Sequence, residues 1–392
     1  MINIISKKNM LLLLFIIAII NSAFCQSKNV EIPDIPGYYT LKCDFHLHTV
    51  FSDGHVWPTL RVNEAIRDGL DVISITDHID YEGFPEIIQK DYNKPFEIAK
   101  SYAENKELIV INGGEISPRV SPYHNNAIFL KDVNKLPIDY MEKTKKEFVM
   151  KDKIKDEELM APFIEAKKQE AFVFYNHPGW PRENNDTTLF TSFHKKLLEK
   201  GLLDGVEIVN SGVYNMLAHK IAEEYNLTML GNSDEHHDIY FKYKESHRPM
   251  TLVFVEEKSE TGIKNALIEK RTAVLVDDFI IARQPEAEQI FKASVDLVHE
   301  KSTKRDIPLL LLTFTNKSDI PFRIRVKSDY NIVNCPLGET ILNPHEPNTI
   351  TLWGLWEFPS ELNLEMEVLN IVVSPEKHLE TNYQLSSLKQ NQ

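Results

Sequence analysis

The sequence predicts an α/β protein in two parts, a parallel β/α barrel or open sheet followed by a small antiparallel β-sandwich. Two observations carry this prediction. After residue 40, short apolar runs alternate with longer segments that show helical spacing. From about residue 285, strand-like runs follow one another without a helix of comparable length between them. The 392 residues are enough for one large domain and one smaller domain.

The predicted strands are rich in β-branched and aromatic residues and are apolar on both faces. Strands of this kind are buried between layers of helices, as in a parallel sheet. They cover residues 41–48, 70–76, 107–113, 126–130, 171–176, 204–210 and 227–232. Helical spacing is found at residues 58–69, 157–170, 193–201 and 216–226. We expect the charged, irregular segments at 131–156 and 236–249 to lie near a functional site.

Residues 1–25 are predicted to be a signal peptide. Two lysines precede an apolar run at 10–20 that is too short for a comfortable transmembrane helix, and small residues follow it. Cleavage after Cys25 would export the mature chain to the periplasm or the medium. Lipid attachment at Cys25 is the alternative, but bulky Phe24 disfavours it, so we expect no membrane anchor.

The chain is acidic, with 44 Lys and Arg against 58 Asp and Glu and a formal net charge of -14. This charge disfavours binding to nucleic acid or to an anionic membrane surface. A small anionic substrate is compatible with it if bound divalent cations reverse the local field. Cys43 and Cys335 are far apart in sequence, and we expect both to be buried thiols rather than ligands or disulfide partners.

Side chains that bind metals recur where the predicted strands end. They are His46, His48, Asp77, His78, Glu115, His124, His177, Asp234 and His236. Residues two apart on a strand point to the same face, so His46 and His48 should converge. The carboxyl ends of parallel strands meet on one face of the sheet, which can bring the whole series together. Imidazole and carboxylate ligands predict a site for divalent Zn, Mn or Fe.

The ordered segments HLHTVFSDG, ITDH, GGEIS, YHNNAIF, NHPG and NSDEH resemble the PHP family, the polymerase and histidinol phosphatase superfamily. The resemblance covers about residues 40–283 and implies a distorted (β/α)7 barrel, similar to a TIM barrel, around a trinuclear metal centre. Residues 285–392 lie outside it and form the predicted C-terminal β-sandwich domain.

The resemblance also implies how the ligands are shared among three ions. One ion is expected on His46, His48, Glu115 and Asp234. A second is expected on Glu115, which bridges, with His124 and His177. A third is expected on His78, His236 and Asp53, with His55 as the competitor of Asp53.

Other polar residues near the motifs receive lesser roles. Asp77 is expected to orient His78 or a water molecule, since metal-binding imidazoles need such carboxylate partners. His237 is expected to be structural. His194 and His219 lie in helical patterns, and we expect both on the surface.

The chemistry expected of such a pocket is hydrolysis by a metal-bridging hydroxide. A third cation favours a phosphoester, either a monoester or a diester, because negative charge spreads over the phosphate oxygens in the transition state. The residues expected to carry catalysis are Glu115, Asp234, His236 and Asp77, and those expected to contact the substrate are Arg119, Asn210 and Tyr214. Two alternatives remain, a metal-dependent amide or carboxyl-ester hydrolase and a non-catalytic metal-containing binding protein. The physiological substrate and the oligomeric state stay open.

Overall fold

A computed structural model describes residues 29–89, 91–144, 147–180, 187–353 and 360–386. The predicted signal peptide at residues 1–25 lies outside this part of the chain. Within the described residues, no helix combines the length and the apolar character needed to cross a membrane.

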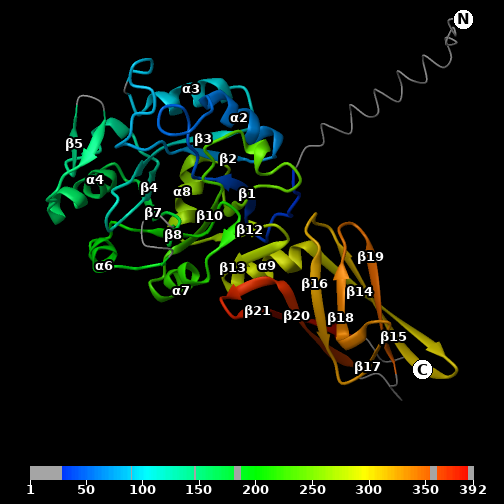
Figure 1. Ribbon diagram of the computed structural model, residues 1–392. Coiled ribbons are helices and arrows are strands. Elements are labelled where there is room, and N and C mark those ends of the chain that lie inside the picture. The colour runs from blue at the N-terminus through cyan, green and yellow to red at the C-terminus, as the bar shows by residue number, and fades with distance from the viewer. Residues whose placement is uncertain (1–28, 90, 145–146, 181–186, 354–359, 387–392) are drawn as a thin grey trace, which may run out of the picture.

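The N-terminal part is built on one curved sheet whose strands follow the order β10-β8-β7-β4-β3-β2-β1-β11-β12-β13 (Figure 1). The strands are β1 (Tyr39–Asp44), β2 (Val72–Ile75), β3 (Ile109–Ile116), β4 (Asn125–Ile128), β7 (Phe172–Tyr175), β8 (Gly205–Asn210), β10 (Thr228–Asn232), β11 (Met250–Val255), β12 (Thr272–Val276) and β13 (Phe279–Ala282). Their side chains are buried on both faces nearly throughout, as the apolar runs predict.

Helices cover this sheet along its length. They are α2 (Pro58–Arg67), α3 (Lys94–Ala103), α4 (Asp156–Lys168), α6 (Ser192–Glu199), α7 (Met216–Glu224) and α8 (Glu260–Ile268). Four of them coincide with predicted helices to within two residues at either end. The pairs β1–β2, β2–β3, β7–β8 and β8–β10 are parallel, which places their carboxyl ends on one edge of the sheet.

Strand β4 departs from the predicted parallel sheet, because it runs antiparallel to both β3 and β7. The direction changes because β3 and β4 are joined by a short connection at residues 117–124, which lacks the crossover helix that a parallel pair needs. As a result the start of β4, rather than its end, lies on the same edge as the carboxyl ends of β3 and β7. His124 therefore reaches the common edge from the residue before its strand.

Strand β10, at one end of the sheet, contacts β11 and β12 through side chains. Thr251 on β11 accepts a hydrogen bond from the Gly231 amide at 2.9 Å and donates one to the Gly231 carbonyl at 3.0 Å. A Cβ atom on Gly231 would lie 2.2 Å from a Val274 methyl group, so only glycine allows β10 to approach β12 this closely.

The irregular segments contain short elements of their own. Residues 131–156 include the 3-10 helix η1 (Val133–Lys135) and the hairpin β5 (Met141–Lys143) with β6 (Phe148–Met150). The 236–249 segment contains the 3-10 helix η2 (Ile239–Phe241). The short strand β9 (Val213–Tyr214) precedes this segment in the chain and pairs with β8. Strand β1 ends at Asp44, earlier than predicted, so His46 and His48 occupy the segment after the strand.

The C-terminal part begins after α9 (Gln284–Ser294) and consists of β-strands (Figure 1). One antiparallel sheet contains β14 (Val295–Lys304), β15 (Ile307–Asn316), β17 (Asn331–Val333) and β19 (Pro347–Trp353). The other contains β16 (Phe322–Lys327), β18 (Glu339–Leu342), β20 (Glu361–Ser374) and β21 (Lys377–Ser386), with the 3-10 helix η3 (Pro336–Gly338) before β18. The prediction of an α/β fold followed by antiparallel β-structure is thus confirmed.

The two parts are joined by more than a linker. Strand β20 pairs in parallel with β13, so the second C-terminal sheet continues the N-terminal one. Buried residues of both parts, among them Ile280, Phe314 and Val368, belong to one hydrophobic core.

Candidate metal centre

Nine residues gather at the edge of the sheet where the parallel strands end. The structure holds four groups of potential metal ligands among the described residues, with the ligand atoms of each group within 4.8 Å of one another. Together the groups contain His46, His48, Asp53, His78, Glu115, His124, His177, Asp234 and His236. These are the nine ligands expected from the sequence, and they are spread along the N-terminal part from His46 to His236.

The deepest group surrounds His46 and His48, which are both fully buried. Their Nε2 atoms lie 3.1 Å apart, and Asp234 Oδ1 lies 3.2 Å and 3.3 Å from them. Glu115 completes the group, with Oε1 at 3.6 Å from His46 Nε2 and Oε2 at 3.4 Å from His48 Nε2. A tetrahedron of ligands about 2.0–2.1 Å from a zinc ion would have edges of roughly 3.4 Å, so this donor set fits a divalent cation.

The orientation of His46 is set by Glu207, a residue that the sequence analysis missed. Glu207 is 1% exposed, and its Oε1 accepts hydrogen bonds from His46 Nδ1 and from Asn232, each at 2.9 Å. Its Oε2 accepts from the His177 amide at 2.7 Å. In the neutral imidazole of His46 the proton therefore sits on Nδ1, which leaves the Nε2 lone pair facing the other ligands. The one signal in the sequence was a single acidic residue inside the apolar run of β8.

Glu115 links this group to a second one. Its Oε1 lies 3.1 Å from His124 Nδ1 and 3.6 Å from His177 Nε2, and it also accepts a hydrogen bond from Asn176 at 2.8 Å. Asp234 Oδ2 reaches His177 Nε2 at 4.0 Å. The indole of Trp180 lies beside both histidines, with ring centroids 5.8 Å from His124 and 5.6 Å from His177. Trp180 therefore forms a wall of the pocket.

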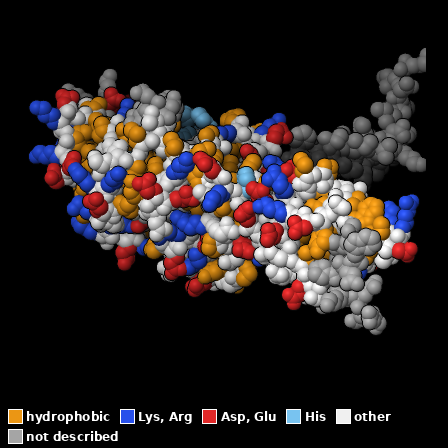
Figure 2. Space-filling model, turned by 90° about the horizontal axis from the view of Figure 1, so that it is seen from below, with side chains coloured by type: hydrophobic (Ala, Val, Ile, Leu, Met, Phe, Trp, Pro, Cys, Tyr) orange, Lys and Arg blue, Asp and Glu red, His pale blue; other side chains and the backbone are white. Residues whose placement is uncertain are grey.

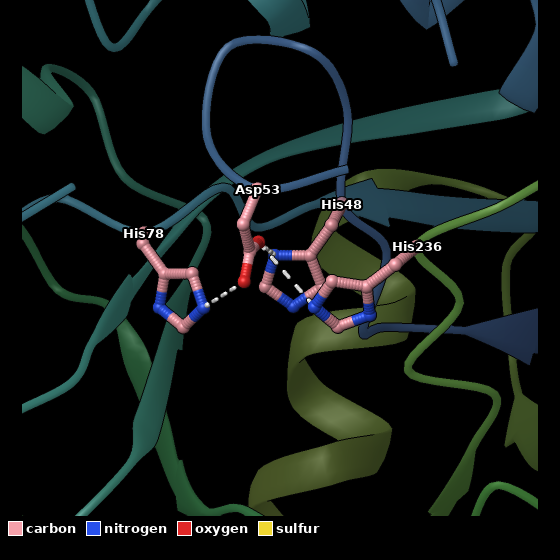
Figure 3. Close-up of side chains that lie close together, drawn as sticks. All are labelled: His48, Asp53, His78 and His236. Carbon is pink, nitrogen blue, oxygen red and sulfur yellow. Dashed lines mark ion pairs between the residues drawn. The ribbon is translucent and has the colours of Figure 1, made fainter. Parts of the chain in front are cut away.

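The third group lies nearer the surface and is shown in Figure 3. Asp53 stands between two imidazoles, with Oδ2 at 3.4 Å from His78 Nε2 and Oδ1 at 3.3 Å from His236 Nε2. His48 stacks on His236 at a centroid separation of 4.1 Å. Asp53 and His236 have the most solvent-exposed side chains of the nine residues, at 36% and 30%. The mouth of the pocket is therefore at this group.

His78 is held by a chain of buried hydrogen bonds. Its Nδ1 lies 2.8 Å from Ser117 Oγ, which donates to Asp80, and Asp80 also accepts from Tyr140 at 3.0 Å. Because the Ser117 proton is used on Asp80, the Nδ1 proton of His78 is shared by two acceptors, Ser117 Oγ and Glu115 Oε2, the latter at 2.9 Å. The Nε2 atom of His78 is then free to act as a ligand beside Asp53.

The charges in the pocket stabilise one another. Burial alone would raise the pKa of Glu115, but His78, His124 and His46 hold it well below its usual range. Burial, together with the nearby His236, lowers the pKa of His48 to about 3, so this imidazole is neutral. Cation binding needs ionised carboxylates and neutral imidazoles, so Glu115 and His48 are already in the required state. Although burial opposes it, the neighbouring carboxylates raise the pKa values of His46 and His78, and these two rings release a proton when a cation binds.

His55 and Asp77 lie near the third group, but neither forms a hydrogen bond or ion pair with the side chains of that group in the described residues. His55 is exposed and stacks on His237 at 4.3 Å, outside the four groups. Asp77 does not reach His78 in any described contact. It accepts hydrogen bonds from the Thr49 amide at 2.7 Å and from Ser52 Oγ at 2.6 Å, and it thereby holds the turn that carries Asp53.

The three side chains expected to contact the substrate differ in how far other residues of the protein engage them. Arg119 is exposed in the segment that follows β3. The Asn210 side chain donates to Glu207 Oε2 at 2.9 Å, and the Tyr214 hydroxyl bonds to His219 Nδ1 at 2.9 Å. For Arg119, in contrast, the described residues show no hydrogen bond or ion pair to the guanidinium group.

The prediction that His194 and His219 lie on the surface is wrong, because both are fully buried. His194 on α6 donates from Nε2 to the Pro122 carbonyl at 3.0 Å, and its Nδ1 accepts from the Thr191 amide at 3.0 Å. The Pro122 segment that bonds to His194 is distant in sequence, so helical spacing alone could not reveal this burial.

An α/β sheet that gathers six imidazoles and three carboxylates at the ends of its strands defines the class of this protein as a metal-binding α/β protein. Comparison with known proteins makes the class specific. The family model for PHP domains matches residues 44–144, and a model for an Ig-like domain matches residues 295–384. A crystal structure of a two-domain protein from Bacteroides vulgatus, described as containing a predicted PHP-like metal-dependent phosphoesterase, is 36% identical with a TM-score of 0.79. That match covers 92% of this chain and 99% of the other, so this chain belongs to the PHP family.

Two further relatives match over shorter lengths. A putative metal-dependent phosphoesterase from Bifidobacterium adolescentis is 19% identical with a TM-score of 0.38, over 50% of this chain and 87% of that chain. An uncharacterized protein from Methanocaldococcus jannaschii is 38% identical over 77 residues, which are 20% of this chain. The match spans about a third, 34%, of that relative's length.

Proposed function

We propose that this protein is a metal-dependent phosphoesterase that hydrolyses small phosphate esters. The observation that carries the proposal is the position of Glu115, whose two oxygens lie within 3.6 Å of nitrogens of five histidines. One buried carboxylate that faces so many imidazoles can bridge neighbouring cations. The description of the Bacteroides vulgatus relative supports the phosphoester as the bond that is cleaved.

The donor sets support three divalent transition-metal ions, Zn, Mn or Fe. The first would be held by His46, His48, Asp234 and Glu115, and the second by Glu115, His124 and His177. The third would be held by Asp53, His78 and His236. Bound there, such ions supply a water-derived nucleophile near neutral pH and positive charge that stabilises the phosphoester in the transition state.

The protein's own residues fix where a substrate can sit. Asp53 and His236 line the open side of the pocket, so a phosphate group enters from there. Trp180 forms a wall beside His124 and His177 and gives an apolar surface for the rest of the substrate. We assign the bidentate contact with two phosphate oxygens to Arg119, an exposed arginine in the segment that follows β3 and Glu115. We assign Asn210 and Tyr214 a weaker role, since both side chains are already hydrogen-bonded within the protein.

A small substrate suits the surface of the molecule. The net charge is -14, and on the face shown in Figure 2 basic and acidic side chains are interspersed. Binding to a nucleic acid backbone needs a continuous basic stripe, which this face does not offer. The size of the alcohol group, and with it the choice between monoester and diester, depends on the loops around the mouth.

We also propose that the protein is exported. The proposal rests on the predicted signal peptide at residues 1–25, and it places the enzyme in the periplasm or the medium. The mass of protein recovered from a native source decides it, because export predicts a chain that begins at Gln26. A chain that still begins at Met1, or one with lipid on Cys25, would contradict the proposal.

The proposed activity is tested with a matched panel of aryl phosphomonoesters, phosphodiesters, carboxyl esters and amides, assayed with Zn²⁺, Mn²⁺ and Fe²⁺ in turn. We expect phosphoester turnover to exceed the other activities. The Asp234→Asn variant should lose orders of magnitude in rate, while Asp329→Asn, an exposed control in the C-terminal part, should be unchanged. Turnover of carboxyl esters or amides alone, or no turnover by fully metallated protein, would overturn the proposal.

A further inference from the structure

Arg61 is a fully buried arginine that contacts the two segments carrying most of the innermost ligands. It lies on α2, beside the buried residues Val62 and Ala65. Its Nε donates to the His48 carbonyl at 2.9 Å, Nη2 to the Glu235 carbonyl at 2.7 Å and Nη1 to the His237 carbonyl at 2.8 Å. One side chain thus joins backbone positions that are separated by nearly two hundred residues.

Glu64 balances the charge of this guanidinium. It is 2% exposed, and its Oε2 accepts from Arg61 Nη1 at 2.7 Å. Its Oε1 accepts from the Ile239 amide at 2.9 Å, so the pair also fixes the start of η2. A buried charge is tolerated only when it is paired and hydrogen-bonded, and here four of the five guanidinium N–H groups have partners.

The two segments that Arg61 joins also contact each other directly. The Asp234 amide donates to the His46 carbonyl at 3.0 Å, the His48 amide to the Glu235 carbonyl at 3.2 Å and the His55 amide to the His236 carbonyl at 2.7 Å. Asp234 adopts a positive φ of 52°, a conformation that costs energy for a residue with a side chain. The pairing is short and strained, so it needs outside support to keep its register.

We propose that Arg61 is a positioning residue of the metal centre, clamping the segment around His48 to the segment 234–237 so that ligands from both meet. The planar fork of a guanidinium can reach three carbonyl groups at once, whereas the ammonium of lysine cannot match that arrangement. The inference rests on the proposed metal centre, but it does not depend on which bond the enzyme cleaves.

The test compares Arg61→Met and Arg61→Lys with the same two substitutions at Arg67 in the full-length chain. Arg67 lies on the same helix, its side chain is 38% exposed and it pairs with Asp68, so it is the matched control. Metal content and affinity are measured by titrating metal-free protein with Zn²⁺ and with Mn²⁺. We expect Arg61→Met to lose about 10–100-fold in affinity, Arg61→Lys to lose less, and both Arg67 variants to match the wild type.

Thermal unfolding separates positioning from a purely structural role. Metal that binds the folded state raises the unfolding temperature by an amount set by its affinity. If Arg61 positions the ligands, the difference in unfolding temperature between metal-loaded and metal-free protein shrinks in its variants. If Arg61 only supports the fold, both temperatures fall together and their difference stays as in the wild type, which overturns the proposal.

Each remaining outcome also decides the matter. Should Arg61→Met fail to fold, Arg61→Lys alone gives the comparison, and failure of both to fold assigns Arg61 to folding and ends the proposal. Wild-type protein that binds metal but cleaves no phosphoester would sink the proposed function and leave this result readable, because no substrate is used.

Discussion

Proton placement on individual imidazoles sets what the pocket can bind. Glu207 holds the proton of His46 on Nδ1, and Ser117 does the same for His78, so both Nε2 lone pairs face into the pocket. Neither partner adjoins its histidine in sequence, and neither has the pattern of a ligand. Ligands such as His46, His78 and His177 were predictable because each follows an apolar run. Glu207, in contrast, lies within β8, and its role becomes clear only when His46 is placed beside it.

His194 gives a pH dependence of stability at the residue scale. Burial lowers its pKa to about 4, and its hydrogen bond to the Pro122 carbonyl opposes this only in part. Between pH 4 and the ordinary histidine pKa of about 6.5 the unfolded chain binds the proton and the folded chain does not, so stability falls as pH falls. The loss contributed by this one group is at most about 3 kcal/mol.

Thermal unfolding at about pH 7 and about pH 5 checks this prediction. His194→Gln should be less stable than the wild type at the higher pH, yet lose less stability on going to the lower pH. His299→Gln, in the C-terminal β-structure, serves as the control and should follow the wild type. Equal losses in the His194 variant and the wild type would contradict the assignment.

At the scale of elements, the sequence predicted which segments form strands and helices better than how they are connected. The strand at β4 was expected, but its antiparallel direction was not, because periodicity reports burial and carries no information on direction. His124 nevertheless reaches the pocket, since reversing the strand moves its first residue to the edge where the parallel strands end. The strands of the β5–β6 hairpin, three residues each, were too short to be predicted.

The turn at residues 49–54 is the element on which the third ligand group depends. Asp77 anchors it through Thr49 and Ser52, and a Cβ atom on Gly54 would lie 2.6 Å from the Thr49 amide nitrogen. We expect Gly54→Ala to push the turn outward, displace Asp53 and reduce the bound metal by about one ion per chain.

Elemental analysis of the Gly54→Ala protein measures this effect. Gly201→Ala is the control, because a Cβ atom there meets nothing within 4 Å although φ is +65°. The control should lose about 1–2 kcal/mol of stability and keep its metal. A full metal complement in Gly54→Ala would show that the turn is not needed for the third ion.

At the scale of the whole molecule, the two parts predicted as separate domains share a sheet and a core. Ile280 and Ile281 of β13 pair with Ile371 and Val372 of β20. This pairing could not be predicted from sequence. The residues of β20 have the pattern of a strand within a β-sandwich, and that pattern does not indicate pairing with a strand of the N-terminal part. The consequence is that the C-terminal part should be coupled energetically to the metal-binding part.

Calorimetric unfolding tests this coupling. A shared core predicts one cooperative transition for the full chain, and added metal should move that transition to higher temperature as a whole. Two separate transitions, of which only one responds to metal, would show instead that the parts unfold independently.

A single buried carboxylate, Glu115, is expected to organise a centre of several ions, and the metal content of the protein measures this role. Elemental analysis of wild-type protein, purified without chelator and supplied with Zn²⁺, Mn²⁺ or Fe²⁺, should give about three ions per chain. Glu115→Gln keeps the shape of the side chain but removes its charge, so it should lose more than one ion at once, together with phosphoesterase activity. Fewer than two ions per wild-type chain, or a Glu115→Gln protein that retains the full complement, would contradict the account.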